Sequence, residues 1–483
     1  MSDPQIQESP ALFDKTLRNL KRAWRGVTRG GRSADQSAVR PDLPEGDADK
    51  LKGMIVACLE GRGGRVSARA RAADLGETYL ALNADGRLRF LRMLVEEFGT
   101  DVVARDAAID ALAHAASDEE RRRAEDELRR CLVPRRVTLL MQFNGLPEGI
   151  KFLVDLRAEV RDALREHPDL APLDRDMRDL LAAWFDVGLL RLERITWQAP
   201  AALLEKLAAY EAVHAIRSWQ DLKNRLDSDR RCYAFFHPNM PGEPLIFVEV
   251  ALVSGIADNI QGLLDEEAPA DDPTLADTAI FYSISNAQRG LDGLSFGEFL
   301  IKQVVDDLSR EMPQLTTFAT LSPLPGFARW IEKERTAEVG EGLLSQTEEE
   351  ALSALCDGMP GPEALACLLD KPRWSEDETA REALEPVLSR LAARYLLMAQ
   401  RGDGQPVDPV ARFHLSNGAN VERLNWLADR SANGMRQSHG LMVNYRYRRD
   451  EIEANHEAFR GEGRIAASAS VRSLAGLKRN GRG

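Results

Sequence analysis

The hydrophobic pattern of this 483-residue chain changes its period near Gly188. From about Asp47 to Trp184, apolar residues recur every three or four positions, which is the spacing of amphipathic helices. After Gly188, short runs of apolar and β-branched residues alternate with Gly- and Pro-containing turns and with further helical stretches. We therefore predict an all-helical domain over residues 45–187 and a mixed α/β domain over residues 188–460.

The second domain is expected to be built on short apolar strands that are bounded by turn residues. The sequence PNMPG at residues 238–242 is typical of a hairpin turn between two of these strands. An amphipathic helix is expected from about Ser295 to Glu311, and residues of about 340–402 return to a helical pattern as an insertion. The expected strands cover residues 231–237, 244–254, 278–285, 314–321, 410–415 and 441–447.

The two ends of the chain differ in composition from the rest. Residues 1–44 include a basic stretch with no acidic residue between Asp14 and Asp35; we interpret it as a flexible tail, and a transit peptide or surface-binding helix is the alternative. Residues 461–483 are rich in Gly, Ser, Ala and Arg, and we expect a second flexible tail there. Because Asp3 and Glu8 stand where a secretory signal would be apolar, we expect a cytoplasmic protein.

Charge and composition exclude several classes of partner and site. The formal net charge is −13, so a nucleic-acid partner would need a local basic patch that overcomes the repulsion. No apolar run approaches the ~18 residues of a membrane-spanning helix. The five cysteines form no CxxC pair and the seven histidines form no HExxH motif, so we expect neither a disulfide framework nor a metal site. These observations predict a protein with no nucleic-acid and no membrane partner.

The segment 278–311 is the best physical candidate for ligand binding. An expected strand, a loop containing Gly290 and Gly293, and an amphipathic helix follow one another there. Loop amides that lead into a helix N-terminus present free N–H groups and the positive end of the helix dipole, which suit a pyrophosphate. The loop matches neither GxGxxG nor GxxxxGK[ST], so a plain tight turn is the alternative from spacing alone.

Two polar residues elsewhere occupy positions that could face a cleft. His414 lies in a strand-like run that leads directly into the turn residues 416–418. Ser322 ends an expected strand and is followed by Pro323 and Pro325. From the residues alone, a buried core histidine and a rigid proline turn explain both positions without a function.

Long segments at concordant spacing run from about Leu190 to Tyr447: LERITWQAP, RRCYAFFHPNMPGEPL, VALVSGIADNIQ, FYSISNAQRGLDGLSFGEFLIKQVV, TLSPLPGFARW, RFHLSNGANVERLNWLAD and GLMVNYRYR. In this order they closely resemble the malonyl-CoA decarboxylase family, and the helical N-terminal part is also of the family's kind. Several long motifs in register are much more specific than any one of them.

The resemblance implies a helical N-terminal domain and a catalytic domain with the fold of the GNAT-type acetyltransferases. In that fold the fourth and fifth strands splay apart, pantetheine lies between them, and the following loop and helix N-terminus hold the pyrophosphate. Residues 288–293 read QRGLDG and depart from the acetyltransferases' Gln/Arg-x-x-Gly-x-Gly/Ala pattern. The family's malonyl-CoA-binding loop corresponds here to Asp292, Gly293, Leu294, Ser295, Phe296, Gly297 and Glu298.

The family's catalytic serine and histidine, a proton acceptor and a proton donor, fall on Ser322 in SPLPGF and His414 in FHLSNG. Loss of CO2 from malonyl-CoA generates a thioester enolate, so the site must hold the carboxylate, stabilise the enolate oxygen and protonate the α-carbon. No metal, biotin or nicotinamide is implied. We expect Ser322 to hydrogen-bond the malonyl carboxylate or thioester oxygen, and His414, titrating near neutrality, to orient it and deliver the proton.

Two alternatives belong to other functional classes. A GNAT-type acyltransferase would use the same cleft with a general base for an amine acceptor, whereas only a decarboxylase converts malonyl-CoA into acetyl-CoA unaided. A non-catalytic acyl-CoA sensor would be marked by loss of Ser322 or His414, and both are present. The resemblance also implies a homo-oligomer, specifically a tetramer assembled through the N-terminal helices.

Further residues could contribute to the same cleft. Asn417, Tyr282 and Tyr447 could line it, although a structural role explains each of them. Candidates for the adenosine phosphates are Lys302, Arg329 and Lys333, since a protein of charge −13 needs local positive charge to receive a polyanion; solvated helix faces explain them equally well.

Overall fold

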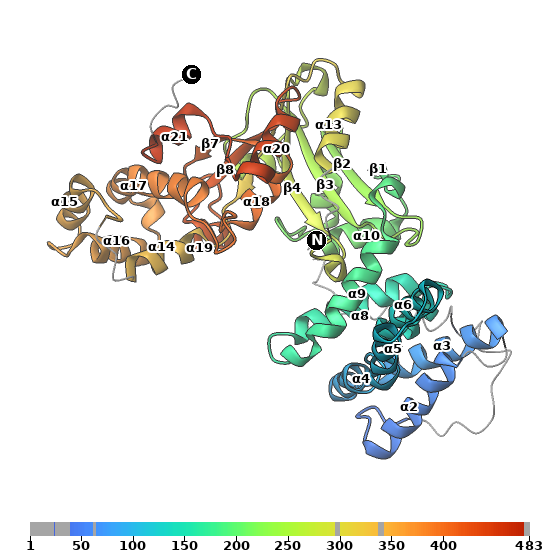
Figure 1. Cartoon of the computed structure of the whole chain (residues 1–483). Helices are drawn as coiled ribbons and strands as arrows, with labels where there is room; N and C mark the ends of the chain where they lie inside the picture. Colours follow the sequence, from blue (N-terminus) through green and yellow to red (C-terminus); the bar gives the residue numbers. More distant parts are fainter. Residues whose placement is uncertain (1–23, 25–38, 61–63, 295–299, 337–341, 478–483) are drawn as a thin grey trace.

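The computed structural model describes Trp24 and residues 39–60, 64–294, 300–336 and 342–477. A helical lobe lies at one end of the molecule and a larger lobe is built around a β-sheet (Figure 1). The predicted fold class is confirmed, because helices alone precede a mixed α/β region. Most of the predicted N-terminal tail lies outside the described residues, as do Ser295, Phe296, Gly297 and Glu298 of the predicted binding loop.

The helical lobe is held together by one apolar core. Its members recur at helical spacing and include Leu51, Tyr79, Leu94 and Phe152, with the indole of Trp24 fully buried among them. Tyr79 also donates a hydrogen bond to Glu159. The helices of this lobe are α2 (Glu45–Leu59), α3 (Gly64–Ala81), α4 (Ala84–Glu96), α5 (Val102–Ala113), α6 (Asp118–Leu132), α7 (Arg135–Phe143), α8 (Gly149–Ala163) and α9 (Ala171–Trp184).

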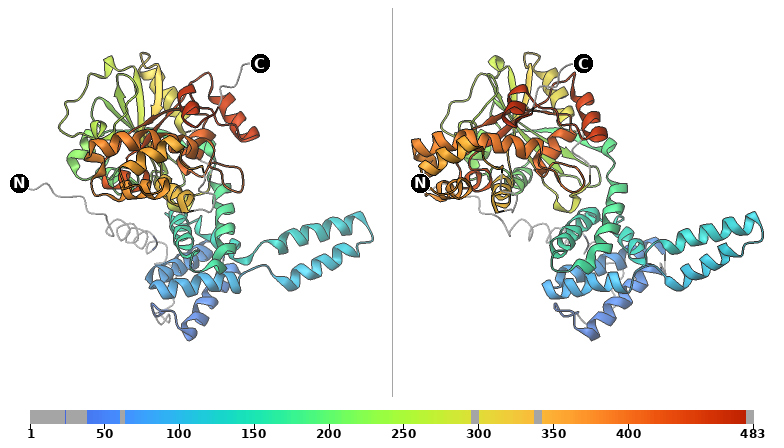
Figure 2. Two further views of the ribbon diagram at one scale, coloured as in Figure 1. Left: turned by 90° about the vertical axis from the view of Figure 1, so that its left-hand side faces the viewer. Right: turned by 60° about the vertical axis from the view of Figure 1, so that its left-hand side comes forward.

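Helices α5 and α6 form an antiparallel hairpin that projects away from the rest of the molecule (Figure 2). Ser117 caps α6, and its acidic first turn and basic last turn complement the helix dipole. Apolar side chains stay exposed along this hairpin: Val103 is 81% exposed, Ile109 46% and Leu132 52%. The hairpin is therefore stabilised mainly by its own two helices and leaves an apolar surface uncovered.

The second lobe is organised by a single sheet in which the strands run in the order β1-β2-β3-β4-β5-β8-β6, with β7 also paired to β8. Only β4 and β5 pair in parallel; the other pairs are antiparallel. The strands are β1 (Arg191–Ile195), β2 (Arg230–Phe236), β3 (Ile246–Val253), β4 (Thr278–Asn286), β5 (Thr317–Thr320), β6 (Ser322–Pro323), β7 (Asn420–Asn425) and β8 (Met442–Arg446).

Strands β4 and β5 diverge along their length. Their register pairs Thr278 with Thr317 and ends at Phe281 opposite Thr320, whereas β4 continues to Asn286 without β5 beside it. The chain that leaves β5 turns toward β8, where Ser322 pairs with Val443. This parallel pair, which opens after four residues and is connected through helix α13 (Leu300–Glu311), is the splayed arrangement that the resemblance implied.

The remaining helices cover the sheet and form the expected insertion. Helix α13 buries Leu300, Val304 and Leu308, as its amphipathic pattern predicted. No helix within the described ranges is long and apolar enough to cross a bilayer. The other helices of this lobe are α10 (Ala201–Tyr210), α11 (Trp219–Asn224), α12 (Ile260–Leu263), α14 (Phe327–Thr336), α15 (Gln346–Ala354), α16 (Gly361–Asp370), α17 (Glu378–Leu397), α18 (Pro409–Ser416), α19 (Ala432–Ser438), α20 (Ile452–Glu462) and α21 (Ala469–Leu474).

The strand predicted at residues 410–415 is wrong, because this segment is helix α18. Asp408 caps the helix by accepting a hydrogen bond from the Ala411 amide at 2.7 Å, and Pro409 occupies the first turn, where its missing N–H costs nothing. Ala411, His414 and Leu415 form the buried face. The short apolar run VARFHL fits both a strand and a helix, and the cap decides between them.

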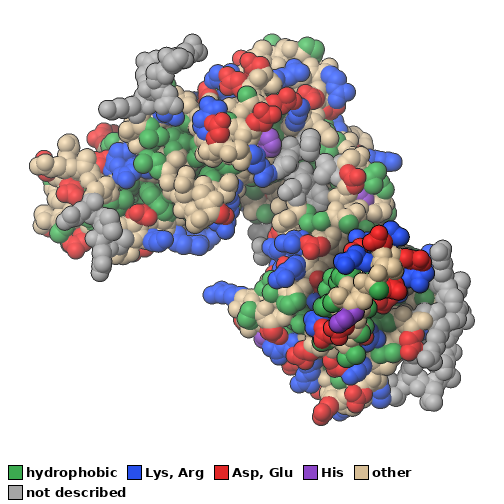
Figure 3. Space-filling model, in the orientation of Figure 1, with side chains coloured by type: hydrophobic (Ala, Val, Ile, Leu, Met, Phe, Trp, Pro, Cys, Tyr) green, Lys and Arg blue, Asp and Glu red, His purple; other side chains and the backbone are tan. Residues whose placement is uncertain are grey.

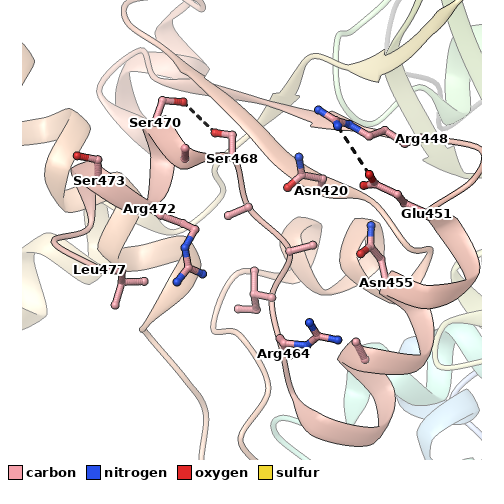
Figure 4. Close-up of a pocket in the computed structure, with 15 residues that line it drawn as sticks. Asn420, Arg448, Glu451, Asn455, Arg464, Ser468, Ser470, Arg472, Ser473 and Leu477 are labelled. Carbon is pink, nitrogen blue, oxygen red and sulfur yellow. Dashed lines mark hydrogen bonds and ion pairs between the residues drawn. The ribbon is translucent and has the colours of Figure 1, made fainter. Parts of the chain in front are cut away.

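The flexible tail predicted at residues 461–483 is wrong for residues 461–477. The chain beyond α20 pairs with β7 through Val421, which donates to Ala466 and accepts from Ser468, each at 2.9 Å. Helix α21 then buries Val471 against the core. This segment forms one wall of a cavity of about 1170 Å³, in which Arg448 pairs with Glu451 (Figure 4). Backbone pairing and apolar contacts with the core order a segment whose composition is that of a linker.

Candidate active site

Ser322 and His414 are separated by 91 intervening residues in the sequence yet meet in the interior of the second lobe. The Oγ atom of Ser322 lies 3.1 Å from Nε2 of His414, and both residues are buried, at 6% and 2% exposure. Ser322 lies in β6, beside the point at which β4 and β5 diverge, and His414 lies on α18. Neither the strand nor the helix alone places these groups together; the packing of α18 on the sheet does.

The orientation of Ser322 is set by its neighbours in the sheet. Its hydroxyl donates to Oγ1 of Thr320 at 2.8 Å, and Thr320 Oγ1 accepts a hydrogen bond from the Tyr445 amide at 3.1 Å. The prolines that follow prevent a continuation of regular strand pairing, so the segment ends as a two-residue strand on β8. Ser322 is thus fixed on one side by Thr320 and on the other by His414.

The second ring nitrogen of His414 is held by Tyr447. The Tyr447 hydroxyl lies 2.7 Å from Nδ1, and the Tyr445 ring stacks on the imidazole with centroids 4.5 Å apart at 25°. Burial lowers the pKa of His414 to about 3, and burial raises the pKa of Tyr447 well above its usual value. The imidazole is therefore neutral and the phenol keeps its proton near pH 7.

The protonation states of His414 and Tyr447 define the tautomer of the imidazole. Within the described part of the chain, the Tyr447 hydroxyl has no other hydrogen-bond partner, so its proton is directed to Nδ1 of His414. An imidazole that accepts at Nδ1 carries its proton on Nε2. Nε2–H therefore donates to Ser322 Oγ. The expectation that His414 titrates near neutrality is wrong, because the ring is buried among aromatic side chains without a carboxylate partner.

The base of α18 carries a second titratable group. Asp408 is fully buried at the N-cap position, and burial raises the pKa of its carboxyl to about 7. The phenols of Tyr395 and Tyr445 lie near it and interact with it electrostatically. Asp408 thus anchors the helix that carries His414 rather than contacting the imidazole itself.

The loop that follows β4 is clamped by the helical lobe. The fully buried Arg157 of α8 donates to the carbonyl of Gly290 at 2.8 Å, and a Cβ atom at Gly290 would overlap the Val154 carbonyl. Arg161 lies 3.8 Å from the Asp292 carboxylate, whose pKa burial raises. Contacts between the lobes therefore fix the described part of the loop.

The predicted site residues divide into groups. Ser322 and His414 are brought together, whereas Asp292, Gly293 and Leu294 lie at the end of the diverging β4, on the loop that α8 clamps. Tyr282 lies in a different apolar cluster from the one that contains Tyr447. Asn417 donates to the Phe413 carbonyl at the end of α18. Lys302 pairs with Glu453 at 2.8 Å. Among the described residues, no cluster of three or more His, Cys, Asp or Glu side chains could hold a metal.

Sequence reasoning left Thr320 and Tyr445 out of the predicted site and offered Tyr447 only as a residue that could line the cleft. Tyr445 lies in β8 and Tyr447 comes two residues later, directly after the strand, so the two side chains lie on one face, as the pattern NYRYR indicates. Thr320 stands two residues before Ser322 by the same alternation. The alternation of side chains could be read from the sequence, but the sequence did not show that helix α18 packs on that face of the sheet.

The fold and the site define a class of protein: a two-domain enzyme in which a helical lobe clamps the loop after β4, and a buried Ser–His pair lies where β4 and β5 diverge. The model of the malonyl-CoA decarboxylase N-terminal domain matches residues 98–185, and that of the C-terminal domain matches residues 188–482.

Relatives match the chain over nearly its whole length. The mitochondrial malonyl-CoA decarboxylase of Anser anser anser is 36% identical over 95% of this chain and 94% of its own. Crystal structures of malonyl-CoA decarboxylases from Rhodopseudomonas palustris and Agrobacterium vitis are 47% and 45% identical, with TM-scores of 0.81 and 0.78; each covers 88% of this chain and 99% of its own. The chain belongs to the malonyl-CoA decarboxylase family, whose members are carboxy-lyases.

Proposed function

We propose that this chain converts malonyl-CoA to acetyl-CoA and CO2, with Ser322 and His414 as the catalytic pair. The observation that carries the roles is the hydrogen bond between Ser322 Oγ and His414 Nε2, in a buried site at the divergence of β4 and β5. Membership of the family supports the reaction, and the proposal assigns its two steps to these side chains.

Loss of CO2 moves an electron pair onto the thioester, so the site needs hydrogen-bond donors for the enolate oxygen. Ser322 receives the Nε2–H of His414, which leaves its own O–H free to turn from Thr320 toward the substrate. The neutral imidazole then stabilises negative charge that develops on Oγ. Ser322 donates to the thioester oxygen in this scheme, and His414 acts through it.

The proton balance follows from the reaction. Decarboxylation breaks the bond between the α-carbon and the carboxylate, and the α-carbon takes up one proton for each CO2 released. Ser322 O–H delivers this proton, Oγ is reprotonated by one proton taken up from solvent, and His414 keeps its Nε2–H, which hydrogen-bonds to Oγ throughout. No residue changes its net charge over the cycle, and we propose that the reaction uses no cofactor beyond the coenzyme A of the substrate.

Release of CO2 and acetyl-CoA from malonyl-CoA by chelator-treated protein tests this proposal. We expect turnover by the parent, and a fall of about 10²-fold or more in kcat for both Ser322→Ala and His414→Asn. An unchanged kcat with a raised KM in the His414→Asn variant would show that His414 has no catalytic role. A parent that binds malonyl-CoA and releases nothing would favour an acyl-CoA sensor, and turnover only with an added amine would favour an acyltransferase.

We propose that the chain assembles as a homo-oligomer, a tetramer, in which the α5–α6 hairpin contacts a second copy. The exposed Val103, Ile109 and Leu132 support this, because a projecting hairpin would otherwise hold these apolar groups in water. Mass measurement by light scattering tests it: Val103→Glu with Ile109→Glu should lower the assembly mass, and Asp106→Asn on the same helix should not. An unchanged mass in the double variant would place the interface elsewhere.

We also propose that the protein functions in a reducing compartment, the cytoplasm. The five cysteines are free thiols, with Cys58, Cys232 and Cys356 buried, which supports a reducing environment. The relative from Anser anser anser is described as mitochondrial, and the mitochondrial matrix is reducing as well. Fluorescent fusions with and without residues 1–38 separate the two locations: mitochondrial signal that depends on these residues would overturn cytoplasmic residence.

A further inference from the structure

A cavity of about 1170 Å³ lies between α20, α21 and β7. Its volume is large enough to hold a small molecule. Neither Ser322 nor His414 lines it, and the described residues of the loop after β4 lie elsewhere. The catalytic pair and the predicted binding loop therefore give this cavity no role.

Helix α20 separates the cavity from the helix that follows β4. Asn455 and Ala458 line the cavity from one face of α20, because residues three apart share a helix face. Glu453 lies on the opposite face, where it pairs with Lys302 of α13 at 2.8 Å. The cavity thus faces away from α13 and from the loop that leads into it, which is where the resemblance places the substrate.

Three guanidinium groups reach the cavity from separate segments (Figure 4). Arg448 follows β8, Arg464 follows α20, and Arg472 lies on α21. Among the described residues that line the cavity, Glu451 is the one carboxylate. The lining is therefore locally positive in a protein of net charge −13, and this favours an anionic ligand.

The nearby carboxylates leave these guanidinium groups incompletely satisfied. Arg448 lies 3.7 Å from Glu451 and 3.5 Å from Glu422. Arg464 lies 3.4 Å from Glu462. A good charge-assisted hydrogen bond is shorter, at about 2.7–2.9 Å. The Nε atom of Arg448 is buried and has no hydrogen-bond partner within the part of the chain that the structure describes. An anion in the cavity would supply acceptors that the protein does not.

Hydroxyl groups complete the polar lining. The Oγ atoms of Ser468 and Ser470 lie 2.8 Å apart, and Ser473 lines the cavity from α21. Such hydroxyls can donate to phosphate or carboxylate oxygens. On the face of the molecule that Figure 3 shows, Lys and Arg side chains are interspersed with Asp and Glu. The attraction for an anion therefore comes from groups that converge in the cavity, and not from a broad positive surface.

The wall formed by α20 also holds the end of the catalytic helix. Asn455 donates to the Gly418 carbonyl at 3.3 Å, and Nδ1 of His456 lies 2.6 Å from the Ser416 carbonyl. Both carbonyls lie at the end of α18, which carries His414. A ligand that contacts Asn455 therefore binds the helix that fixes this end of α18.

We propose that the cavity between α20, α21 and β7 is a second ligand site, which binds a compact polyanion and stabilises the contact between α20 and α18. The ligand carries two or more phosphate or carboxylate groups, because guanidinium groups bind both kinds of oxyanion and here approach from separate walls. Arg448, Arg464 and Arg472 are the ligating side chains. This site goes beyond the proposed reaction and does not depend on it.

Calorimetric titration with inorganic pyrophosphate and with propane-1,2,3-tricarboxylate tests the site without turnover. We expect the parent to bind at least one probe, and the tighter probe identifies a phosphate or a carboxylate ligand. Arg464→Gln combined with Arg472→Gln should weaken binding about 100-fold, since each substitution removes a charge-assisted hydrogen bond that contributes about tenfold. The control is Arg460→Gln, which lies on α20 outside the lining and should leave the affinity unchanged.

The single variant Arg464→Gln separates loss of binding from loss of folding. Its side chain is 65% exposed, so the substitution should leave the melting temperature unchanged and weaken binding about 10-fold. An affinity equal to that of the parent in both the single and the double variant would overturn the site. Absence of binding of either probe to the parent would overturn it as well.

Hydrogen exchange locates the bound probe. Saturation should slow exchange in α20, in α21 and at residues 416–418, and leave residues 287–294 unchanged. Protection at residues 287–294 without protection of α20, or displacement of the probe by coenzyme A, would place the probe in the substrate's site and overturn the proposal. Protection of α20 that does not extend to residues 416–418 would overturn the coupling to α18.

Discussion

The Tyr447 hydroxyl and Nδ1 of His414 are 2.7 Å apart, and this contact determines which ring nitrogen carries the proton. In a serine hydrolase triad a carboxylate accepts from Nδ1–H, so that Nε2 can remove a proton from the serine. Here a phenol with a raised pKa donates to Nδ1, and Nε2–H faces Ser322. This arrangement fits the proposed role of the pair as hydrogen-bond donors to an enolate and does not fit the activation of a serine nucleophile.

Replacing Tyr447 with Phe should lower kcat by about 10-fold with little change in KM. The substitution leaves Nδ1 without its donor, which costs about 1–3 kcal/mol in a buried site and allows the proton to move to Nδ1. Steady-state kinetics and the 15N chemical shifts of His414 measure both effects. Phe281→Leu, which alters a ring packed against Tyr447, is the control for packing alone. A full-activity Phe variant with Nε2 still protonated would contradict the tautomer assignment.

The pH dependence of the reaction should lack a histidine ionisation near neutrality. With a pKa of about 3, His414 stays neutral from pH 5 to 8, so kcat/KM should show no acidic limb that His414→Asn abolishes. The effect on stability also has a defined sign, because the pKa of His414 in the folded protein is below the unfolded value of 6.5. The neutral imidazole therefore contributes fully to the free energy of unfolding above pH 6.5, and this contribution is lost as the pH falls toward 3. Rate profiles and melting curves across this range test both statements.

Replacing Asp408 with Asn should raise thermal stability above pH 7. The pKa of Asp408 is about 7 in the folded protein and 3.8 in the unfolded chain. The stability that the protein gains from the protonated carboxyl is therefore fully present below pH 3.8 and is lost as the pH rises through about 7. Asn stays neutral and can still cap α18. We expect a higher Tm than the parent at pH 8 and nearly the same Tm at pH 4. Asp408→Ala, which also removes the cap, should be about 1 kcal/mol less stable than Asp408→Asn at either pH; equal stability of the two variants would contradict this account.

Replacing Gly290 with Ala should destabilise the contact between the loop after β4 and α8. A methyl group there overlaps the Val154 carbonyl, and such overpacking costs about 1–3 kcal/mol. We expect a lower Tm and a higher KM for malonyl-CoA. Gly53→Ala is the matched control, since a Cβ meets nothing within 4 Å in helix α2, and it should be neutral or stabilising by about 0.5–1 kcal/mol. A Gly290 variant as stable as the parent would show that the loop can move away from α8.

The order of the two lobes and most strands of the sheet were predictable from the sequence, because hydrophobic period is a local property. The run TAIFYSIS became β4 and the amphipathic pattern after it became α13, nearly as expected. Residues 410–415 were mistaken for a strand because VARFHL has no clear period, and the cap at Asp408 was overlooked. Strands β1 and β7 were missed because residues such as Arg191 and Glu422 interrupt their apolar pattern.

The sequence by itself determined the family, the residues Ser322 and His414, and the glycine-containing loop after β4, since these are carried by motifs along the chain. Only the tertiary structure decided the chemistry of the pair. The neutral state of His414 comes from complete burial among aromatic rings, and its tautomer comes from the Tyr447 hydroxyl, 33 residues away and just after β8. Desolvation and hydrogen-bond direction depend on groups that the fold gathers from distant parts of the chain, so no local pattern contains them.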